Sequence, residues 1–462
     1  MDHFTGRANA KTVSILALTR AEFKRWKKAQ AKATQNWLDA SSFEAGAGAT
    51  IEIPARDGSV ARILLGLGSG SDTPLWSYAA LPGRLPKGRY QLENELDPEQ
   101  AHIACLGWAL ATYDFDRYKT KGHKKFPSLV WPKGVDRKAV ERERNAVFLA
   151  RDLINTPAAD LGPAELAEQA STVALEHDAS VTVTTGEALI AEGYPAIYAV
   201  GKGSVREPRL VDIRWGDEAN PKLTLVGKGV VFDTGGLDLK SAAGMKLMKK
   251  DMGGAAAILA IAQMIMDAQL PVRLRVLLPI VENAISGHAY RPSDVLETRK
   301  GITVEVGNTD AEGRLILCDA LAEAQSEDPD LLIDFATLTG AARVALGTEL
   351  PALFSTDDEV AAAILAAGED CHDPMWRMPL FRPYRRHLDS KIADINNIAS
   401  VGQGGAITAA LFLQEFVGKK VAWVHVDTMG YNVHARPGRP AGGEAFGVRA
   451  MFEMLRRRYA GS

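Results

Sequence analysis

The C-terminal two thirds of the chain alternates short apolar runs with longer segments of helical spacing. Runs such as "KLTLVG", "VRLRVLLPIV" and "DLLIDFAT" are apolar almost throughout, which is typical of strands that helices cover on both faces. The segments "GGAAAILAIAQMIMDAQ" and "RLILCDALAEAQ" have the length and apolar content of buried helices. The pattern predicts an α/β domain whose central sheet is mixed and covered by helices on both faces.

The first part of the chain predicts a second, smaller α/β domain. Strand-like "TVSILAL" and "ARILLGL" alternate with helical segments that include "HIACLGWALATYDFDRY". A stretch containing proline and lysine, "KTKGHKKFPSLVWPKGVD", then precedes the charged helical segment "RKAVERERNAVFLARDLI". Such changes in composition mark domain boundaries. We therefore predict an N-terminal α/β domain over residues 1–135, a connecting helix over 136–160 and a larger domain over 161–462.

Composition narrows the classes of function. The 462 residues include 54 Lys and Arg against 57 Asp and Glu, a net charge of −3, which gives no general attraction to nucleic acid or to an anionic membrane. No run reaches the roughly 18 apolar residues of a membrane span, and the N-terminus lacks the pattern of a cleaved leader. We expect a cytoplasmic protein without a membrane partner. Cys105, Cys318 and Cys371 lack metal-ligand spacing, so we expect buried, reduced thiols.

Charged residues follow the predicted strands, in loops where such sheets bind ligands. Three loops carry them: Lys228, Asp233 and Lys240 in the first, Asp251 in the second, and Asp310, Glu312 and Arg314 in the third; the uncharged polar loop "ATLTG" is a fourth candidate. Alone, each has an ordinary explanation, because aspartates cap helices and form turns and lysines are usually solvated. We expect these loops to converge at one edge of one sheet, with Asp310 and Glu312 on the same side of an extended link.

Four carboxylates at one sheet edge would repel one another and resist ionisation unless cations neutralise them. Oxygen ligands favour hard or borderline ions such as Mn, Mg or Zn. In two-metal hydrolytic sites, carboxylates bridge the ions and the ion pair activates a water molecule. The chain contains no HExxH motif, P-loop, dinucleotide fingerprint or GxSxG motif. The combination therefore favours a carboxylate site for divalent metals.

Three motifs resemble those of known enzymes and occur in the same order along the chain as they do there. "VGKGVVFDTGGLDLK" (226–240), "MKKDMGGAA" (248–256) and "NTDAEGRL" (308–315) closely resemble the leucyl aminopeptidase family, the cytosolic two-metal aminopeptidases. Further matches such as "GAITAALFLQEFV" extend the resemblance over about residues 145–450. The resemblance implies a metal-dependent exopeptidase that hydrolyses the N-terminal residue of peptides through a bridging water.

Matched position by position, the resemblance implies the metal ligands. Asp233 and Glu312 would bridge two divalent ions, and Asp310 would complete the more readily exchanged site. Lys228 and Asp251 would complete the tighter site. A lysine ligand must be neutral, so nearby ions would strongly depress the pKa of Lys228. Manganese or zinc is expected, with magnesium or cobalt as alternatives.

The resemblance also implies the catalytic and substrate-binding residues. Lys240 would donate to the carbonyl oxygen as it becomes an oxyanion, and Arg314 would hold a bicarbonate that serves as general base. The free α-amine of the substrate would bind the exchangeable metal. The matched substrate-binding positions are Met248, Thr337, Leu338 and Gly340. They imply a preference for leucine and other apolar residues, which a hydrophobic pocket enforces only broadly.

The resemblance implies a homohexamer in which the first domain governs assembly. One alternative is a narrower dipeptidase or amino-acid amidase that uses the same site. Another is DNA binding, because some family members are architectural factors and the patches "FKRWKKAQAK" (23–32) and "KTKGHKKF" (119–126) are basic. Solvated surfaces explain such patches better, so nucleic acid is not favoured as a partner. An inactive relative is disfavoured because all seven reactive positions are present.

Overall fold

The computed structural model describes residues 3–69, 73–120 and 124–460. The chain divides into two compact units, Met1–Phe148 with His434–Ala441 and Leu149–Val433 with Gly442–Ser462. The division falls within helix α5 (Arg137–Asn155), which corresponds to the predicted connecting helix. Among the described helices, none combines the length and the apolar character needed to cross a membrane.

The first unit contains a sheet of strand order β1-β6-β5-β2-β4-β3, in which β3 is antiparallel to β4 and the other pairs are parallel. Its helices and strands are β1 (Phe4–Thr5), β2 (Val13–Thr19), α1 (Arg20–Lys28), α2 (Lys32–Ala40), β3 (Thr50–Pro54), β4 (Val60–Gly68), α3 (Pro74–Ala79), β5 (Arg89–Leu92), α4 (Pro98–Leu110) and β6 (Ser128–Val130).

Two sequence predictions for this unit were wrong in detail. Helix α4 ends at Leu110, although the predicted helical segment continues to Tyr118. Thr112 closes the last turn by donating its hydroxyl to the Ala109 carbonyl at 2.7 Å. A hydroxyl that bonds the backbone in this way competes with helix continuation. The proline- and lysine-containing stretch, taken from its composition as a domain boundary, lies inside the first unit instead, because it includes strand β6, which pairs with β1 and β5.

The second unit is built on a sheet of nine described strands, with order β16-β15-β18-β14-β9-β11-β8-β7 and β10 paired with β11. Its helices and strands are α6 (Pro163–Leu175), β7 (Ser180–Thr185), α7 (Ala188–Ala191), α8 (Pro195–Gly201), β8 (Arg209–Trp215), β9 (Lys222–Gly227), β10 (Gly229–Asp233), α9 (Ala242–Met245), the 3₁₀-helix η1 (Met248–Met252), α10 (Gly253–Asp267), β11 (Arg273–Asn283), β12 (Val295–Leu296), β13 (Val304–Glu305), α11 (Glu312–Ala324), η2 (Gln325–Glu327), β14 (Leu331–Ala336), α12 (Gly340–Leu346), β15 (Ala352–Ser355), α13 (Asp358–Asp370), β16 (Trp376–Arg377), η3 (Arg382–Leu388), β17 (Ile395–Asn396), α14 (Gly405–Gln414), β18 (Trp423–Asp427), β19 (Tyr431–Asn432), β20 (Gly442–Gly443) and α15 (Val448–Tyr459).

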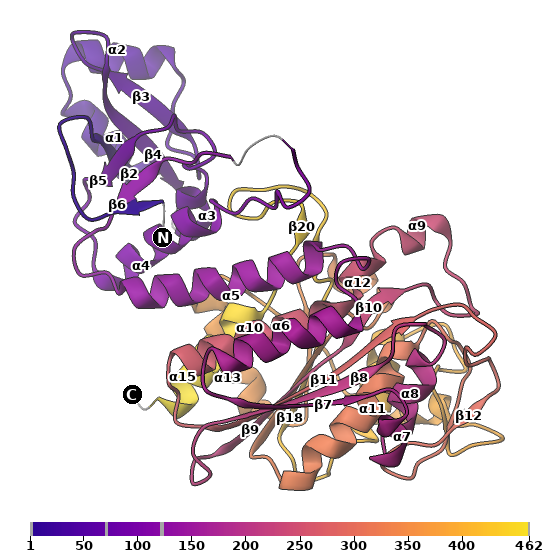
Figure 1. Cartoon of the computed structure of the whole chain (residues 1–462). Helices are drawn as coiled ribbons and strands as arrows, with labels where there is room; N and C mark the ends of the chain where they lie inside the picture. Colours follow the sequence, from indigo (N-terminus) through magenta and orange to yellow (C-terminus); the bar gives the residue numbers. More distant parts are fainter. Residues whose placement is uncertain (1–2, 70–72, 121–123, 461–462) are drawn as a thin grey trace. The chain divides into compact units, whose positions relative to one another are not determined.

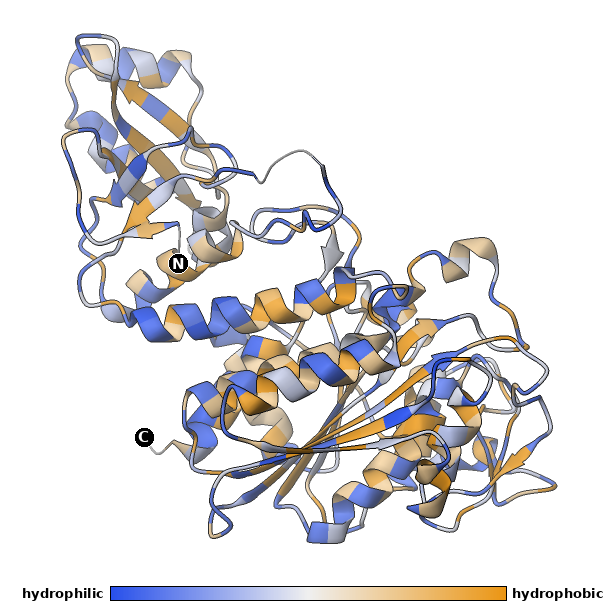
Figure 2. Cartoon of the chain, in the orientation of Figure 1, coloured by the Kyte–Doolittle hydropathy of each residue, from blue (hydrophilic) through white to orange (hydrophobic). Residues whose placement is uncertain are grey.

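Helices cover both faces of this sheet. Helices α6 and α10 lie against one face, and α7, α8 and α11 lie against the other (Figure 1). Apolar residues run along the central strands (Figure 2), and β14 is buried at every position. Strands β9, β11, β14 and β18 are parallel where they pair, whereas β8 is antiparallel to β7 and β11. The predicted fold class, a smaller α/β domain plus a larger one with a covered mixed sheet, is confirmed.

The structure corrects two predictions about the strands that lead to the site. The segment after "KLTLVG" was predicted as a loop, but Gly229–Asp233 forms strand β10, so Asp233 ends a strand. The charged loops were expected at one edge of one sheet, but the strand-like segment "ITVEV" before Asp310 contributes only β13, which belongs to a separate three-stranded sheet with β12 and β17. The charged segments therefore come from two sheets rather than from one.

Candidate metal and substrate site

A pocket of about 640 Å³ lies where strands β10, β14 and β18 end, a volume typical of ligand sites. Every predicted site residue except Arg314 lines it: Lys228, Asp233, Lys240, Met248, Asp251, Asp310, Glu312, Thr337, Leu338 and Gly340. Further lining residues include Leu247, Lys250, Arg343, Asp427 and Met429. The sequence prediction had not identified these five.

Three carboxylates in this pocket are close enough to share a metal ion. Asp233, Asp310 and Glu312 each offer an oxygen atom, and these atoms lie within 4.8 Å of one another. Asp233 and Glu312 are buried, whereas Asp310 is partly open to solvent. Glu312 is the first residue of helix α11, so it does not share an extended link with Asp310 as predicted. The turn into the helix nevertheless brings the two carboxylates together.

Two lysines balance the carboxylates. Lys228 Nζ lies 2.7 Å from Asp251 Oδ2 and 2.9 Å from Glu312 Oε1. Lys240 Nζ lies 2.7 Å from Asp233 Oδ2 and also contacts Asp310. Burial lowers the pKa of Lys228, but the carboxylates of Asp251 and Glu312 outweigh it and raise the pKa. The depressed pKa predicted for Lys228 depends on metal ions and stays a prediction.

The buried carboxylates have chemistry that fits divalent ions. Burial raises the pKa of Asp233 to about 6, and burial together with the Asp233 charge raises the pKa of Glu312 well above its usual value. Glu312 Oε2 is buried without a hydrogen-bond partner among the described residues. A bound cation would favour the ionised carboxylates and satisfy this oxygen. The residues present therefore fit a site for divalent metal.

Metal binding is expected to strengthen as the pH rises. Metal ligands must be deprotonated, so Asp233 loses its capacity to bind as the pH falls through about 6, and Lys228 must release a proton. Calorimetric titration with Mn²⁺ between about pH 5.5 and 8.5 measures this, and buffers of different ionisation enthalpy report the protons released. An affinity that stayed constant over this range would contradict the assignment of these ligands.

Uncharged side chains hold the metal-ligand segments in place. Asn283, the last residue of β11, donates from Nδ2 to Asp233 Oδ1 at 2.8 Å and to the Thr309 carbonyl at 3.1 Å. Tyr290 donates its hydroxyl to the same carbonyl at 2.6 Å. Thr309 in turn donates its hydroxyl to the Gly235 carbonyl at 2.6 Å. The segments around Asp233 and Asp310 therefore form one hydrogen-bonded unit, which no sequence motif had indicated.

Asp427, at the end of β18, fixes the loop after β14. Its Oδ1 accepts from the backbone N–H groups of Leu338 and Thr339 at 2.9 and 3.2 Å, and its Oδ2 accepts from the Thr339 hydroxyl at 2.6 Å. Thr337 donates its hydroxyl to Asp251 Oδ1 at 2.8 Å. The Leu338 N–H is therefore occupied by Asp427, and Thr337 orients a predicted metal ligand.

Arg314 lies on helix α11 but does not line the pocket. It is buried, its Nη1 donates to the Asn397 carbonyl at 2.6 Å, and its Nε has no hydrogen-bond partner within the described chain. Burial lowers the pKa of Arg314 to about 10. A buried guanidinium that retains an open donor fits a small anion such as bicarbonate.

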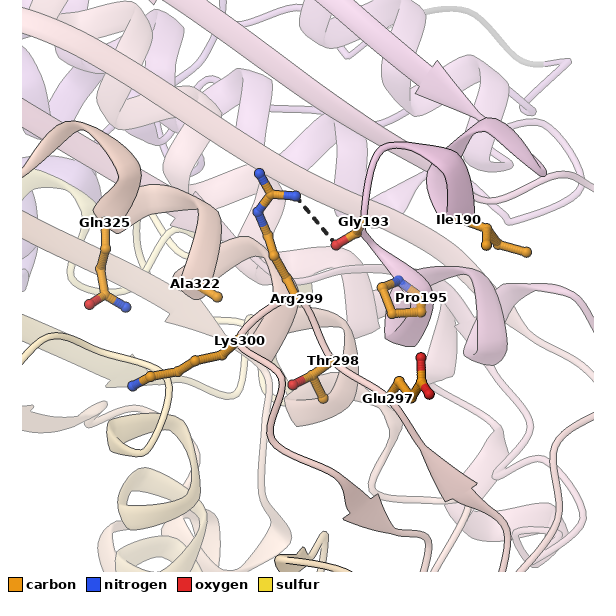
Figure 3. Close-up of a pocket in the computed structure, with 9 residues that line it drawn as sticks. All are labelled: Ile190, Gly193, Pro195, Glu297, Thr298, Arg299, Lys300, Ala322 and Gln325. Carbon is orange, nitrogen blue, oxygen red and sulfur yellow. Dashed lines mark hydrogen bonds between the residues drawn. The ribbon is translucent and has the colours of Figure 1, made fainter.

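A second pocket, of about 540 Å³, lies elsewhere in the same unit, between the start of α8 and the end of α11. Figure 3 shows Arg299 extended toward the Gly193 carbonyl, to which Nη1 donates at 3.3 Å. Arg299 also pairs with Glu323, and Lys300 Nζ donates to the Glu415 carbonyl. The cations of this pocket already have protein partners, so it is a weaker candidate for a ligand site.

The two basic patches gain no support as a nucleic-acid surface. In the first, Lys27 pairs with Asp39 at 2.5 Å, which reduces its availability to phosphate. In the second, residues 121–123 lie outside the described residues.

The mixed α/β fold and the carboxylate pocket at its strand ends are those of a metal-dependent hydrolase. Residues 148–452 match the model of the cytosol aminopeptidase family, catalytic domain, and residues 13–132 match the M17 aminopeptidase N-terminal domain. The chain therefore belongs to the cytosol aminopeptidase family. This membership supports a metal-dependent N-terminal exopeptidase.

Individual relatives agree with the family assignment. A probable cytosol aminopeptidase of Desulfovibrio desulfuricans is 47% identical over 317 residues, which cover 67% of this chain and 63% of that protein. A probable cytosol aminopeptidase of Rhodococcus jostii is 39% identical over 433 residues, which cover 88% of this chain and 85% of that protein. The crystal structure of the cytosol aminopeptidase from Coxiella burnetii aligns with a TM-score of 0.94 and 47% identity, over 99% of this chain and all of the other. The bottromycin maturation enzyme BotP in complex with Mn aligns with a TM-score of 0.86 and 35% identity, over 97% of this chain and 99% of BotP.

Proposed function

We propose that this chain is a two-metal aminopeptidase that releases N-terminal residues, leucine and other apolar residues among them, from peptides. The observation that carries the proposal is the convergence of Asp233, Asp310 and Glu312, whose oxygen atoms lie within 4.8 Å of one another beside Lys228 and Asp251. These are the residue types and positions that the family resemblance assigns to the metals. We propose manganese or zinc as the metal, and the Mn in the BotP complex supports manganese.

The five ligands would divide between two ions. Asp233 and Glu312 would bridge, Asp310 would complete the exchangeable site, and Lys228 with Asp251 would complete the other. The exposure of Asp310 and the burial of Lys228 agree with this division, because a partly open ligand exchanges its ion more readily. When bound, the ions supply Lewis acidity and lower the pKa of a shared water, which makes it a nucleophile near neutral pH.

Two cations of the chain would act on the substrate and the water. Lys240, with its ammonium in the pocket beside Asp233, would donate a hydrogen bond to the substrate carbonyl oxygen as negative charge develops there. Arg314 would hold a bicarbonate through its open Nε and so orient a general base. Leu247, Met248 and Met429 would contact an apolar side chain. We further propose a homohexamer in the cytoplasm that takes part in peptide breakdown.

The test is metal analysis of the purified protein together with its turnover of leucine p-nitroanilide. We expect bound divalent metal, and we expect chelation to reduce turnover by at least about 100-fold, since metal ions stabilise the transition state by several kcal/mol. Manganese or zinc should restore it. N-acetyl-leucine p-nitroanilide is the matched control, because it lacks the free amine and should not be cleaved. Full turnover after complete removal of metal would reject the proposal.

A further inference from the structure

Lys250 is a buried lysine of the pocket that none of the proposed catalytic steps uses. It lies on the 3₁₀-helix η1, lines the pocket beside Met248, and is 6% exposed. Within the described part of the chain, the carboxylate oxygen nearest its Nζ is Asp251 Oδ1, at 4.0 Å. That distance is beyond hydrogen-bond reach. Lys250 therefore lines the pocket, and its ammonium group has no hydrogen-bonded counter-ion among the described residues.

The acidic groups near Lys250 are engaged by other residues. Asp251 accepts the Thr337 hydroxyl on Oδ1 and lies 2.7 Å from Lys228 Nζ through Oδ2. Asp427 accepts two backbone N–H groups on Oδ1 and the Thr339 hydroxyl on Oδ2. Among the described residues, neither carboxylate lies within hydrogen-bond distance of Lys250 Nζ. Because an unpaired buried charge is unfavourable, Lys250 would attract an anion that entered the pocket.

Arg343 brings a second cation to the same pocket. It lies on α12 and is exposed. Burial lowers the pKa of Lys250, and the nearby positive charge of Arg343 also contributes to lowering it. A methyl group added at Gly340 would lie 3.6 Å from Arg343 Nη2, so the guanidinium folds back over Gly340. The family resemblance assigns Gly340 and Met248 to the wall that contacts the first side chain of the substrate. Both cations therefore line the same pocket as this wall.

We propose that Lys250, assisted by Arg343 at the exposed rim, binds the side-chain carboxylate of an N-terminal glutamyl or aspartyl residue. Met248 and Met429 would contact the methylene groups of such a side chain, as they would contact leucine. The site would then accept acidic residues in addition to apolar ones. This inference rests on the proposed aminopeptidase function and extends it to a further class of substrate.

The test compares kcat/KM for glutamyl, glutaminyl and leucyl p-nitroanilides. A charge-assisted hydrogen bond predicts that glutamyl is preferred over its uncharged isostere glutaminyl, and that Lys250→Met lowers the glutamyl-to-leucyl ratio about 10- to 100-fold. Because each variant is measured with both substrates, partial loss of metal or of folded protein cancels in the ratio. Lys250→Glu should invert the preference toward lysyl and arginyl substrates, a gain that misfolding cannot produce.

Lys249→Met is the matched control. Lys249 is the preceding residue of η1, but its Nζ donates to the Asn155 carbonyl and it does not line the pocket. Its substitution should leave the glutamyl-to-leucyl ratio unchanged. Calorimetric titration with free glutamate and glutamine gives a second measure that does not depend on turnover. Glutamate should bind more tightly than glutamine to the wild type and to Lys249→Met, but not to Lys250→Met.

The outcomes separate this inference from the proposed function. Leucyl turnover with glutamyl no better than glutaminyl, or a ratio that Lys250→Met does not change, would overturn the inference and leave the aminopeptidase intact. If Lys250→Met changed kcat/KM for free dipeptides but not for p-nitroanilides, the lysine would bind the α-carboxylate of the peptide. That result would also overturn the inference. Absence of turnover with every substrate would reject both.

Discussion

Replacing Glu312 by glutamine is expected to remove metal binding and to reduce aminopeptidase turnover by at least about 10³-fold. Glu312 is 1% exposed, its Oε1 lies 2.9 Å from Lys228 Nζ, and its Oε2 has no hydrogen-bond partner among the described residues. Glutamine keeps the size of the side chain but removes the charge and turns an amide group toward the ligands. Metal content by mass spectrometry and turnover of leucine p-nitroanilide measure the two losses.

A glutamate at the other end of the same helix provides the control for Glu312. Glu323 is also buried, but it pairs with Arg275 at 2.6 Å and does not line the pocket. Glu323→Gln should lower thermal stability, because it weakens a buried ion pair, and should keep the metal. If Glu312→Gln retained both metals and turnover, Glu312 could not be a bridging ligand and the two-metal proposal would fail.

The fold was predictable where the apolar pattern was long. Strands such as β9 and β14 and helices such as α10 and α11 have enough consecutive apolar residues to identify them, and burial on both faces explains the pattern. The two strands that were wrong are short. Residues Gly229–Asp233 form β10 because β11 is 11 residues long and pairs with β9 along its first half and with β10 along its second. Pairing of that kind is a tertiary property that the local sequence does not carry.

Strand β13 shows a second limit. The alternation in "ITVEV" predicts a half-buried strand, but it cannot indicate which sheet the strand joins. The structure pairs Val304–Glu305 with β12 and β17, and the Asn397 side chain beyond β17 accepts from the Gly307 N–H at 2.7 Å. That hydrogen bond holds the turn that carries Asp310. The site therefore depends on contacts between residues about ninety positions apart, which only the fold reveals.

The candidate site was predictable where a short motif contains residue types that indicate metal binding. Asp233 and Glu312 stand in short motifs of distinctive order, so resemblance identified them, and the structure brings them together. Asn283 and Asp427 were missed because each acts through a single side chain at the end of its strand. Lys250 was missed for another reason, since a lysine beside another lysine usually indicates a solvated surface. Only its burial in the pocket distinguishes it.

Gly313→Ala is expected to reduce metal affinity and kcat/KM by at least about 100-fold, since misplacing a catalytic group by 1 Å can have an effect of that size. A methyl group at Gly313 would lie 2.5 Å from Lys228 Cε and 2.7 Å from its Nζ. Lys228 cannot turn away freely, because it is buried and its Nζ contacts Asp251, Glu312 and the Thr337 carbonyl. The new methyl group would therefore displace the ammonium from the position of a metal ligand. Metal titration and leucine p-nitroanilide kinetics measure the effect.

The fold should survive the Gly313 substitution, which makes the prediction specific. Alanine favours a helix over glycine by up to about 1 kcal/mol, and Gly313 lies in the first turn of α11, so helix stability opposes the steric effect. Gly287→Ala is the matched control, because Gly287 is exposed and a methyl group there would have no atom within 4 Å. We expect unchanged metal and turnover in the control. A Gly313→Ala protein that melted far below the wild type would indicate a packing role for the glycine, and one that kept its metal would show that Lys228 is not a ligand.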